Sequence, residues 1–184
     1  MGRMDIRLVL SLLLPRFRAS RIRYAVIGGV AVGIHAKPRA TRDVDFLVHR
    51  DDLQRVHEIL VAMGYERLTL TRSFSRYESA AEPFGDVDIQ HAAGPATIGM
   101  LRRANRVAQT GLRGTMRVVR PEDLIVLKAV AMANQPARRF QDYPDMVNVA
   151  KAAGARLRWA MMRGHFAALQ KPNMERRLKR DIRK

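Results

Sequence analysis

The first two-thirds of the chain carry short apolar runs of two kinds. Some alternate apolar and polar positions, as strands do, and others repeat their apolar positions every three to four residues, as helices do. Strands are expected at residues 24–27, 44–49, 67–71, 74–79, 86–90 and 116–120. Helices are expected at 4–14, at 30–35, from an N-cap at Asp51 or Asp52 to Met63, and at 97–109. This mixture predicts a sheet domain over residues 1–120.

The last third of the chain has only the helical pattern. Pro121, followed by Glu122 and Asp123, is a typical helix start, and the apolar run continues to Ala133. Further helices are expected at 144–153 and 156–169, before a basic tail at 173–184. The order of elements predicts an α/β (α+β) fold, in which a mixed sheet is flanked by helices and a helical C-terminal region, 121–184, packs on the sheet domain.

The composition adds a core and an expected partner. Hydrophobic residues make up 47% of the chain, which is enough for a core, and the absence of cysteine excludes disulfides and thiolate zinc sites. Lys and Arg number 34 against 17 Asp and Glu, so the formal net charge is +17. Such an excess predicts a polyanionic partner, with nucleic acid preferred over an anionic membrane; a basic proteome would give the same bias.

The longest apolar run near the N-terminus is too short to span a membrane. It extends from Leu8 to Leu14, whereas a membrane helix needs about 20 residues. Arg3 and Arg7 resemble the charged start of a signal peptide, but Pro15 follows the run without a clean cleavage site. We therefore expect a packed N-terminal helix, a cytoplasmic location and no membrane partner.

Candidate chemistry begins with two carboxylates on one expected strand. Asp43 and Asp45 are two residues apart, so they share one face with Cα atoms about 6.6 Å apart. A third carboxylate is expected from residues 86–90, where Asp86 and Asp88 compete; Asp88 is preferred because Val87 and Ile89 flank it. Oxygen ligands on rigid strands suit Mg²⁺, with two ions expected and Mn²⁺ as a substitute.

A glycine pair lies between the first expected strand and the helix that follows it. Gly28 and Gly29 have no side chains, so backbone N–H groups at the helix start could approach a triphosphate. Arg39 and Arg42, just before the carboxylate pair, could bind phosphate or form salt bridges with Asp43 and Asp45.

These motifs together resemble a known superfamily. Val26-Ile27-Gly28-Gly29 followed by Asp43-Val44-Asp45-Phe46 is similar to the signature of the DNA polymerase beta-type nucleotidyltransferases. Thr41-Arg42-Asp43-Val44-Asp45-Phe46 resembles the minimal nucleotidyltransferases related to AbiEii toxins. Leu127-Lys128-Ala129 and Gln141-Asp142-Tyr143-Pro144-Asp145-Met146 resemble that family's lysine and Asp-x-x-Asp motifs.

The resemblance implies a metal-dependent transfer of a nucleotide from a nucleoside triphosphate. It assigns metal binding to Asp43, Asp45 and Asp88, and it implies that Lys128 contacts the triphosphate or supports the site, with Asp142 or Asp145 close by. From the residues alone, Lys128 could equally be a lysine extending from the edge of the core, and the two later aspartates could be helix caps.

We therefore expect a nucleotidyltransferase that acts on an RNA acceptor, with tRNA preferred. The resemblance places it as the toxin of a toxin–antitoxin or abortive-infection system, with an antitoxin protein as a partner. The alternatives are nucleotidylation of a protein side chain or an antibiotic, and a catalytically silent nucleic-acid-binding module. The tail 173–184 is either a solubilising end or an arm for RNA phosphates.

Overall fold

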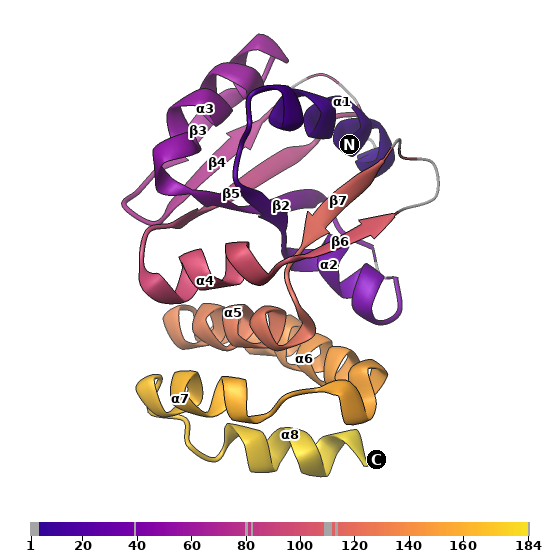
Figure 1. Ribbon diagram of the computed structural model, residues 1–184, viewed down its shortest axis with the longest axis vertical. Helices are drawn as coiled ribbons and strands as arrows, with labels where there is room; N and C mark the ends of the chain where they lie inside the picture. The colour runs from indigo at the N-terminus through magenta and orange to yellow at the C-terminus, as the bar shows by residue number, and fades with distance from the viewer. Residues whose placement is uncertain are drawn as a thin grey trace. The chain divides into compact units, whose positions relative to one another are not determined.

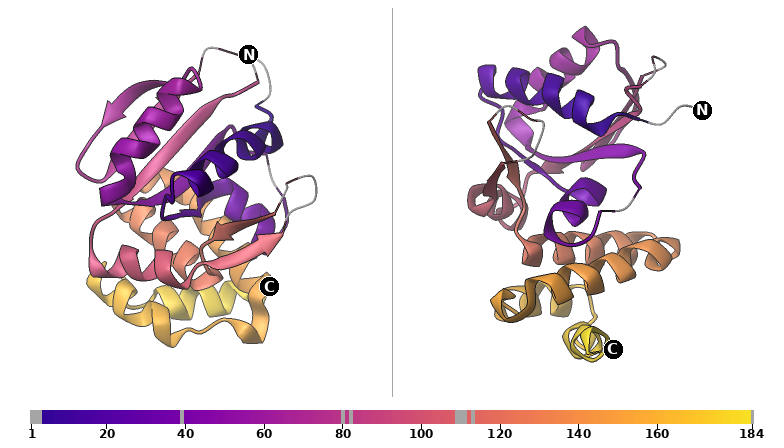
Figure 2. Two further views of the ribbon diagram at one scale, coloured as in Figure 1. Left: turned by 45° about the horizontal axis from the view of Figure 1, so that its top comes forward. Right: turned by 90° about the vertical axis from the view of Figure 1, so that its right-hand side faces the viewer.

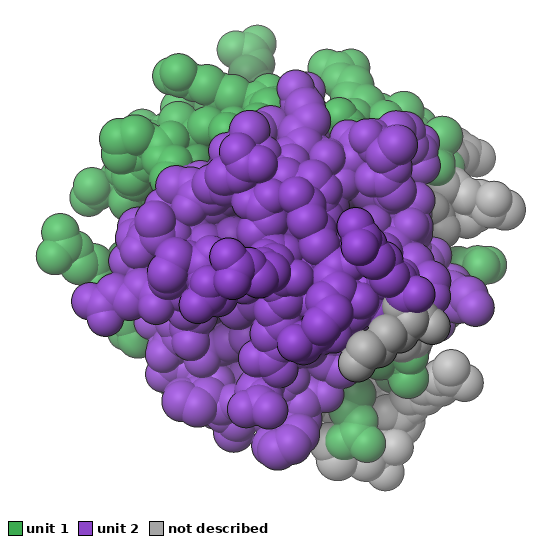
Figure 3. All heavy atoms as spheres, turned by 90° about the horizontal axis from the view of Figure 1, so that it is seen from below, with its two compact units in different colours: residues 1–30, 40–119 green, residues 31–39, 120–184 purple. Residues whose placement is uncertain are grey.

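The computed structural model divides the chain into two compact units (Figure 3). It describes residues 4–38, 40–79, 81, 83–108, 112 and 114–183. The first unit contains residues 1–30 and 40–119, and the second contains residues 31–39 and 120–184. In the described part of the chain, no helix is both long and apolar enough to cross a bilayer.

A seven-stranded mixed sheet forms the first unit (Figure 1). Its strands are β1 (Tyr24–Val26), β2 (Asp43–His49), β3 (Glu66–Leu70), β4 (Phe74–Glu78), β5 (Asp86–Ala92), β6 (Asn105–Ala108) and β7 (Thr115–Val118), in the order β3-β4-β5-β2-β1-β7-β6. The pairs β1–β7 and β2–β5 are parallel and the others antiparallel. The predicted mixed sheet is therefore confirmed.

Two helices of the first unit cover one face of the sheet. They are α1 (Ile6–Ala19) and α3 (Leu53–Ala62), which lie side by side (Figure 2). The Phe17 ring of α1 is 5.3 Å from both the Tyr24 ring of β1 and the Phe46 ring of β2. Because side chains alternate along a strand, Phe46 on this face places Asp45 on the other. This packing fixes the direction in which the carboxylates of β2 point.

A buried carboxylate ties the start of β1 to the start of α3. Asp52 ends a short 3₁₀ turn (Arg50–Asp52), and its side chain is fully buried. It accepts hydrogen bonds from the Arg23 backbone N–H at 2.8 Å and the Arg23 guanidinium at 2.9 Å, and it also contacts Arg55. Burial alone would raise the pKa of Asp52, but the hydrogen bonds from Arg23 and Arg55 lower it to about 2.

Replacing Asp52 by Asn is expected to cost about 2 kcal/mol of unfolding free energy at pH 7. Because the folded pKa lies below the unfolded one, this contribution is present above pH 4 and declines as the pH falls toward 2. Urea unfolding of both proteins at pH 7 and pH 3 measures it, and the difference should shrink to about half at pH 3. A difference that does not change with pH would contradict this account.

The second unit consists of helices. They are residues 31–35 of α2 (Gly28–His35), α5 (Pro121–Asn134), α6 (Arg139–Ala153), α7 (Ala160–Ala168) and α8 (Met174–Ile182), with 3₁₀ turns at Pro136–Arg138 and Gly154–Arg156. Helix α5 contacts α6 and α7, and α6 contacts α8 (Figure 1). Met174 and Leu178 of α8 are buried, and the Tyr143 hydroxyl donates to Asp181 at 2.7 Å. The tail to residue 183 is thus a packed helix, while Lys184 lies outside the described residues.

Four expected boundaries are wrong. The helix predicted at 4–14 is α1, which continues through Pro15 to Ala19. The helix predicted at 97–109 is α4 (Pro95–Arg103), and residues 105–108 instead form β6, which exists because β7 pairs with it. The helix predicted from residue 156 begins at Ala160, after a turn in which Gly154 adopts a φ of 54°. Helix α6 begins at Arg139, before Pro144, so Pro144 lies inside the helix and removes one backbone hydrogen bond of its second turn.

Candidate active site

Three carboxylates converge on neighbouring strands of the first unit. β2 and β5 are parallel, with Asp43 opposite Asp86 and Asp45 opposite Asp88. Asp43, Asp45 and Asp88 each offer a carboxylate oxygen, and these atoms all lie within 4.8 Å of one another. Ligand oxygens around an octahedral Mg²⁺ are about 3–4 Å apart, so small side-chain movements would bring the three oxygens to that spacing. The donor set therefore fits a divalent cation.

Gly28 makes room for one of these carboxylates. It begins α2 (Gly28–His35) with a φ of 60°, and a Cβ atom on it would lie 1.8 Å from Asp45 Oδ2. The segment before Gly28 is bound to β2, because the Ile27 N–H donates to the Asp45 carbonyl at 3.0 Å. The glycine pair was predicted to admit a triphosphate. In the structure, glycine is required at position 28 because the Asp45 side chain approaches it closely.

Gly29 makes room for a threonine that contacts the first carboxylate. A Cβ atom on Gly29 would lie 2.6 Å from Thr41 Oγ1. The Thr41 hydroxyl donates to Asp43 Oδ1 and so orients that side chain. Gly28 thus leaves space for Asp45, and Gly29 leaves space for the threonine that orients Asp43.

A Gly28→Ala variant is expected to lower nucleotidyl transfer about 100-fold, because displacing Asp45 by about 1 Å disrupts the site. Gly64→Ala is the matched control: Gly64 also has a positive φ, 85°, but nothing lies within 4 Å of its added Cβ. Both variants should lose stability because of the positive φ, Gly28→Ala should lose more because of the clash with Asp45, and only Gly28→Ala should lose activity. Equal activity in the two variants would show that the space beside Asp45 does not matter.

Arg76 is a site residue that sequence reasoning missed. β4 is antiparallel to β5, and its Arg76 lies opposite Asp88. Its guanidinium donates to both carboxylate oxygens of Asp88, at 2.8 and 2.7 Å. The hydrogen bond to Asp88 raises the pKa of Arg76, and the charges of Asp86 and Asp43 add to the effect. The alternation of β4, with Ser75 and Tyr77 buried, was the available signal, but the pairing partner was not visible in sequence.

Asp86, the competing third ligand, lies beside the group. It is paired in register with Asp43. Burial raises the pKa of Asp86; the charge of Arg76 opposes this, while those of Glu78, Asp88 and Asp43 add to it. A fourth carboxylate so close to the other three increases the need for a cation. The spacing places Asp88 with the pair and Asp86 next to it.

The arginines near the motif are only partly described. Arg42 precedes β2 and is exposed. Arg39 lies outside the described residues.

The second unit brings together the other three predicted residues. Lys128 Nζ of α5 lies 2.7 Å from Asp142 Oδ1 and 2.8 Å from Asp145 Oδ2, both on α6. The Lys128 side chain is 6% exposed and those of Asp142 and Asp145 are 1% and 4% exposed. Arg138 also donates to Asp142, at 2.8 Å. Lys128 is therefore not a lysine reaching out from the core edge, and the two aspartates lie inside α6 rather than capping it.

Several solved structures share this fold. A nucleotidyltransferase-like protein from Paracoccidioides brasiliensis, described as antigenic, has a TM-score of 0.60 and 18% identity, covering 95% of this chain and 92% of that one. The antibiotic-resistance factor ANT(2″)-Ia, in complex with adenylyl-2″-tobramycin, has a TM-score of 0.66 and 13% identity, covering 89% and 96%. A putative nucleotidyltransferase from Thermotoga maritima has a TM-score of 0.54 and 12% identity, covering 78% and 97%.

The family is established by sequence. No curated protein matches the chain. The model of a family described as uncharacterised nucleotidyltransferase matches residues 5–177, nearly the whole chain. The superfamily resemblance is confirmed at this level, whereas the narrower resemblance to AbiEii toxins stays a prediction. The chain belongs to this nucleotidyltransferase family.

Proposed function

We propose that this nucleotidyltransferase uses Mg²⁺ held by Asp43, Asp45 and Asp88 to transfer a nucleoside monophosphate to RNA. The observation that carries the metal site is the spacing of the three carboxylates, within 4.8 Å of one another on rigid parallel strands. Bound Mg²⁺ would supply a Lewis acid that offsets the negative charge of the triphosphate and of the departing pyrophosphate.

Residues of the chain are proposed to bind the phosphates and to accept the proton of the acceptor. The first N–H groups of α2, beginning at Gly28, have no carbonyl partner within the helix and would donate hydrogen bonds to phosphate oxygens. Arg42, exposed beside Asp43, would bind the outer phosphates. The acceptor oxygen attacks the α-phosphorus, its proton passes to Asp88, and the bond to the β-phosphate breaks. Arg76 orients Asp88 by holding both of its oxygens.

Lys128, Asp142 and Asp145 are proposed to hold helices of the second unit together rather than to touch the triphosphate. Both carboxylates already hold the Lys128 ammonium at hydrogen-bond distance, and all three side chains are buried. An ammonium in this position locks α5 to α6 and is not available as a phosphate donor. The proposed role of Lys128 is therefore positional.

RNA is proposed as the acceptor because of charge. The chain has a net charge of +17. Beside helix α8 lies a hollow of about 550 Å³, whose charged lining is one acidic residue, Glu175, and four basic ones, Arg176, Lys179, Arg180 and Arg183. Steep salt dependence is expected for such an interaction. tRNA remains the preferred acceptor, and a toxin role with an antitoxin partner remains the proposed biological setting.

Incubation with each α-³²P-labelled NTP, Mg²⁺ and total tRNA tests the acceptor. Labelled RNA that depends on Mg²⁺ and on Asp43 is expected. A labelled protein band with unlabelled RNA would replace RNA by a protein side chain as the acceptor. Absence of any label with all four NTPs, despite salt-sensitive RNA binding, would favour a silent binding module.

An antibiotic hydroxyl is the second candidate acceptor. The fold is shared with ANT(2″)-Ia, whose complex contains adenylyl-2″-tobramycin. The net charge of +17 disfavours a cationic drug, since like charges repel on approach. Modified tobramycin in the same assay, with RNA unlabelled, would favour this candidate.

A further inference from the structure

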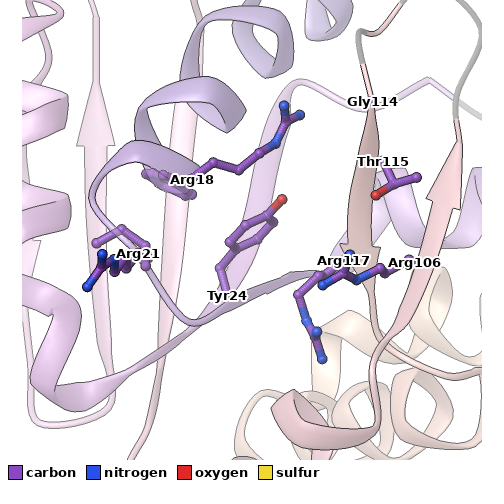
Figure 4. A pocket seen from close by; sticks show the side chains of 9 residues that line it. Arg18, Arg21, Tyr24, Arg106, Gly114, Thr115 and Arg117 are labelled. Atoms are coloured by element: carbon purple, nitrogen blue, oxygen red, sulfur yellow. The ribbon is translucent and has the colours of Figure 1, made fainter.

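The first unit contains a second hollow, lined by cations. Its volume is about 470 Å³ (Figure 4). Four of its nine lining residues are arginines and none is acidic; they are Phe17, Arg18, Arg21, Ile22, Tyr24, Arg106, Gly114, Thr115 and Arg117. Four arginines and no acidic residue around one hollow give it a positive potential, which favours the approach of an anion.

The walls of this arginine pocket come from three parts of the fold. Figure 4 shows Arg18 extending from α1 above the Tyr24 ring, with Thr115 across the space on β7. Arg117 Nη2 is anchored to the end of α4, because it donates to the Leu101 carbonyl at 2.7 Å. The position of the Arg117 guanidinium is thus fixed by α4, whereas Arg18, Arg21 and Arg106 are exposed.

The pKa of the Tyr24 hydroxyl depends on the arginines around it. Tyr24 is only 4% exposed. Burial raises the pKa of Tyr24, while the positive charges of Arg18, Arg117 and Arg106 act to lower it. A backbone hydrogen bond with Arg117 also acts to lower the pKa of Tyr24, so this buried hydroxyl lies within the field of the arginines that line the hollow.

Arg21 occupies a backbone position that normally favours glycine. Its φ is 51°, in the left-handed region. The Ile22 N–H donates to the Phe17 carbonyl at 2.8 Å and the Arg21 N–H to the Arg18 carbonyl at 3.0 Å, the hydrogen bonds of a Schellman helix end. Position 21, which lines the pocket, is therefore occupied by an arginine although glycine would be less strained there.

The pocket does not belong to the carboxylate site. Tyr24 packs against Phe46, on the face of the sheet opposite Asp45. Tyr24 also begins β1, whereas Gly28 lies just beyond its end, about 13 Å further along an extended chain. The arginine pocket and the carboxylate site therefore lie on opposite faces of the sheet.

We propose that the arginine pocket binds backbone phosphates of an RNA strand. The side chains of Arg18, Arg21 and Arg106 are exposed, so they can contact successive phosphates of a strand rather than one enclosed anion. Arginine presents a planar fork that matches phosphate oxygens. The choice of RNA as the source of phosphate rests on the proposed function, but the pocket itself does not.

The test measures binding without NTP, so it does not require transfer. Fluorescence anisotropy with a labelled single-stranded RNA 12-mer compares the wild type with Arg21→Gly/Arg106→Ala. The matched control is Arg67→Ala/Arg72→Ala, which removes the same charge near β3, at the other edge of the sheet. The pocket variant should bind at least about tenfold more weakly, and its slope of log Kd against log salt should fall by about 1.4. The control should change Kd by less than about twofold.

Stability and competition complete the test. Arg21→Gly should leave the thermal midpoint unchanged or raised, because glycine suits this φ. Arg106→Glu, a charge reversal on an exposed edge strand, gives an independent second variant and should also weaken binding. Equal losses in the pocket and control variants would overturn the proposal, as would complete displacement of RNA by millimolar inorganic phosphate, which would assign the pocket to a free anion. If RNA binding depends on the pocket but the wild type transfers no nucleotide to RNA, the pocket would still be assigned to RNA binding, and RNA as the acceptor would be rejected.

Discussion

Asp45→Asn is expected to lower the rate of nucleotide transfer by about 10³-fold or more while leaving the fold intact. The carboxylate is one of three whose oxygens lie within 4.8 Å of one another, and asparagine keeps its shape without its charge. Losing one anionic ligand removes about 4 kcal/mol of transition-state stabilisation, which corresponds to about 10³ in rate. Single-turnover transfer from a labelled NTP measures the effect.

The control for Asp45→Asn is Glu66→Gln. Glu66 is an exposed carboxylate on β3 of the same sheet, so this variant removes the same charge away from the site. Its activity should equal that of the wild type. Asp45→Asn should also unfold at the same or a higher temperature, because carboxylates that repel one another are relieved. Transfer within tenfold of the wild type would contradict the assignment of Asp45.

Lys128→Met is expected to lower the unfolding free energy by about 3–5 kcal/mol. The Lys128 ammonium lies between Asp142 and Asp145, and removal would leave two buried carboxylates without it. Urea unfolding followed by far-UV circular dichroism measures the change. Lys151→Met, at an exposed position on α6, is the control and should shift stability by no more than about 0.5 kcal/mol.

A second substitution separates the charge from the packing. Adding Asp145→Asn to Lys128→Met should restore part of the lost stability, because one of the two buried negative charges is neutralised. A loss below about 1 kcal/mol in Lys128→Met would mean that the buried pairs contribute little. Further loss on adding Asp145→Asn would contradict the electrostatic explanation.

The strands that carry the carboxylates could be predicted from sequence because their signals are local. Val44 and Phe46, like Val87 and Ile89, are fully buried, and the aspartates between them fall on the opposite face. Two such strands predicted a shared site, and the parallel register of β2 and β5 brings it together. The glycine pair was predicted for a triphosphate, and its contact with Asp45 needed coordinates.

What the sequence could not predict depends on distant pairing. Arg76 reaches Asp88 only because β4 pairs with β5, and β6 is a strand only because β7 lies beside it. The arginine pocket joins α1 to the two strands β6 and β7, far apart in the chain. From the sequence, Lys128 could equally be a lysine extending from the edge of the core, because its burial depends on how α5 packs against α6.

The most direct test of the central claim is a Mn²⁺ titration followed by electron paramagnetic resonance of the free ion. The wild type should bind Mn²⁺ saturably and Mg²⁺ should compete. Asp43→Asn/Asp45→Asn should weaken binding at least about tenfold, since two of three carboxylate ligands lose their charge, and Glu66→Gln should not change it. Superimposable titrations of the wild type and Asp43→Asn/Asp45→Asn would contradict the proposed metal site.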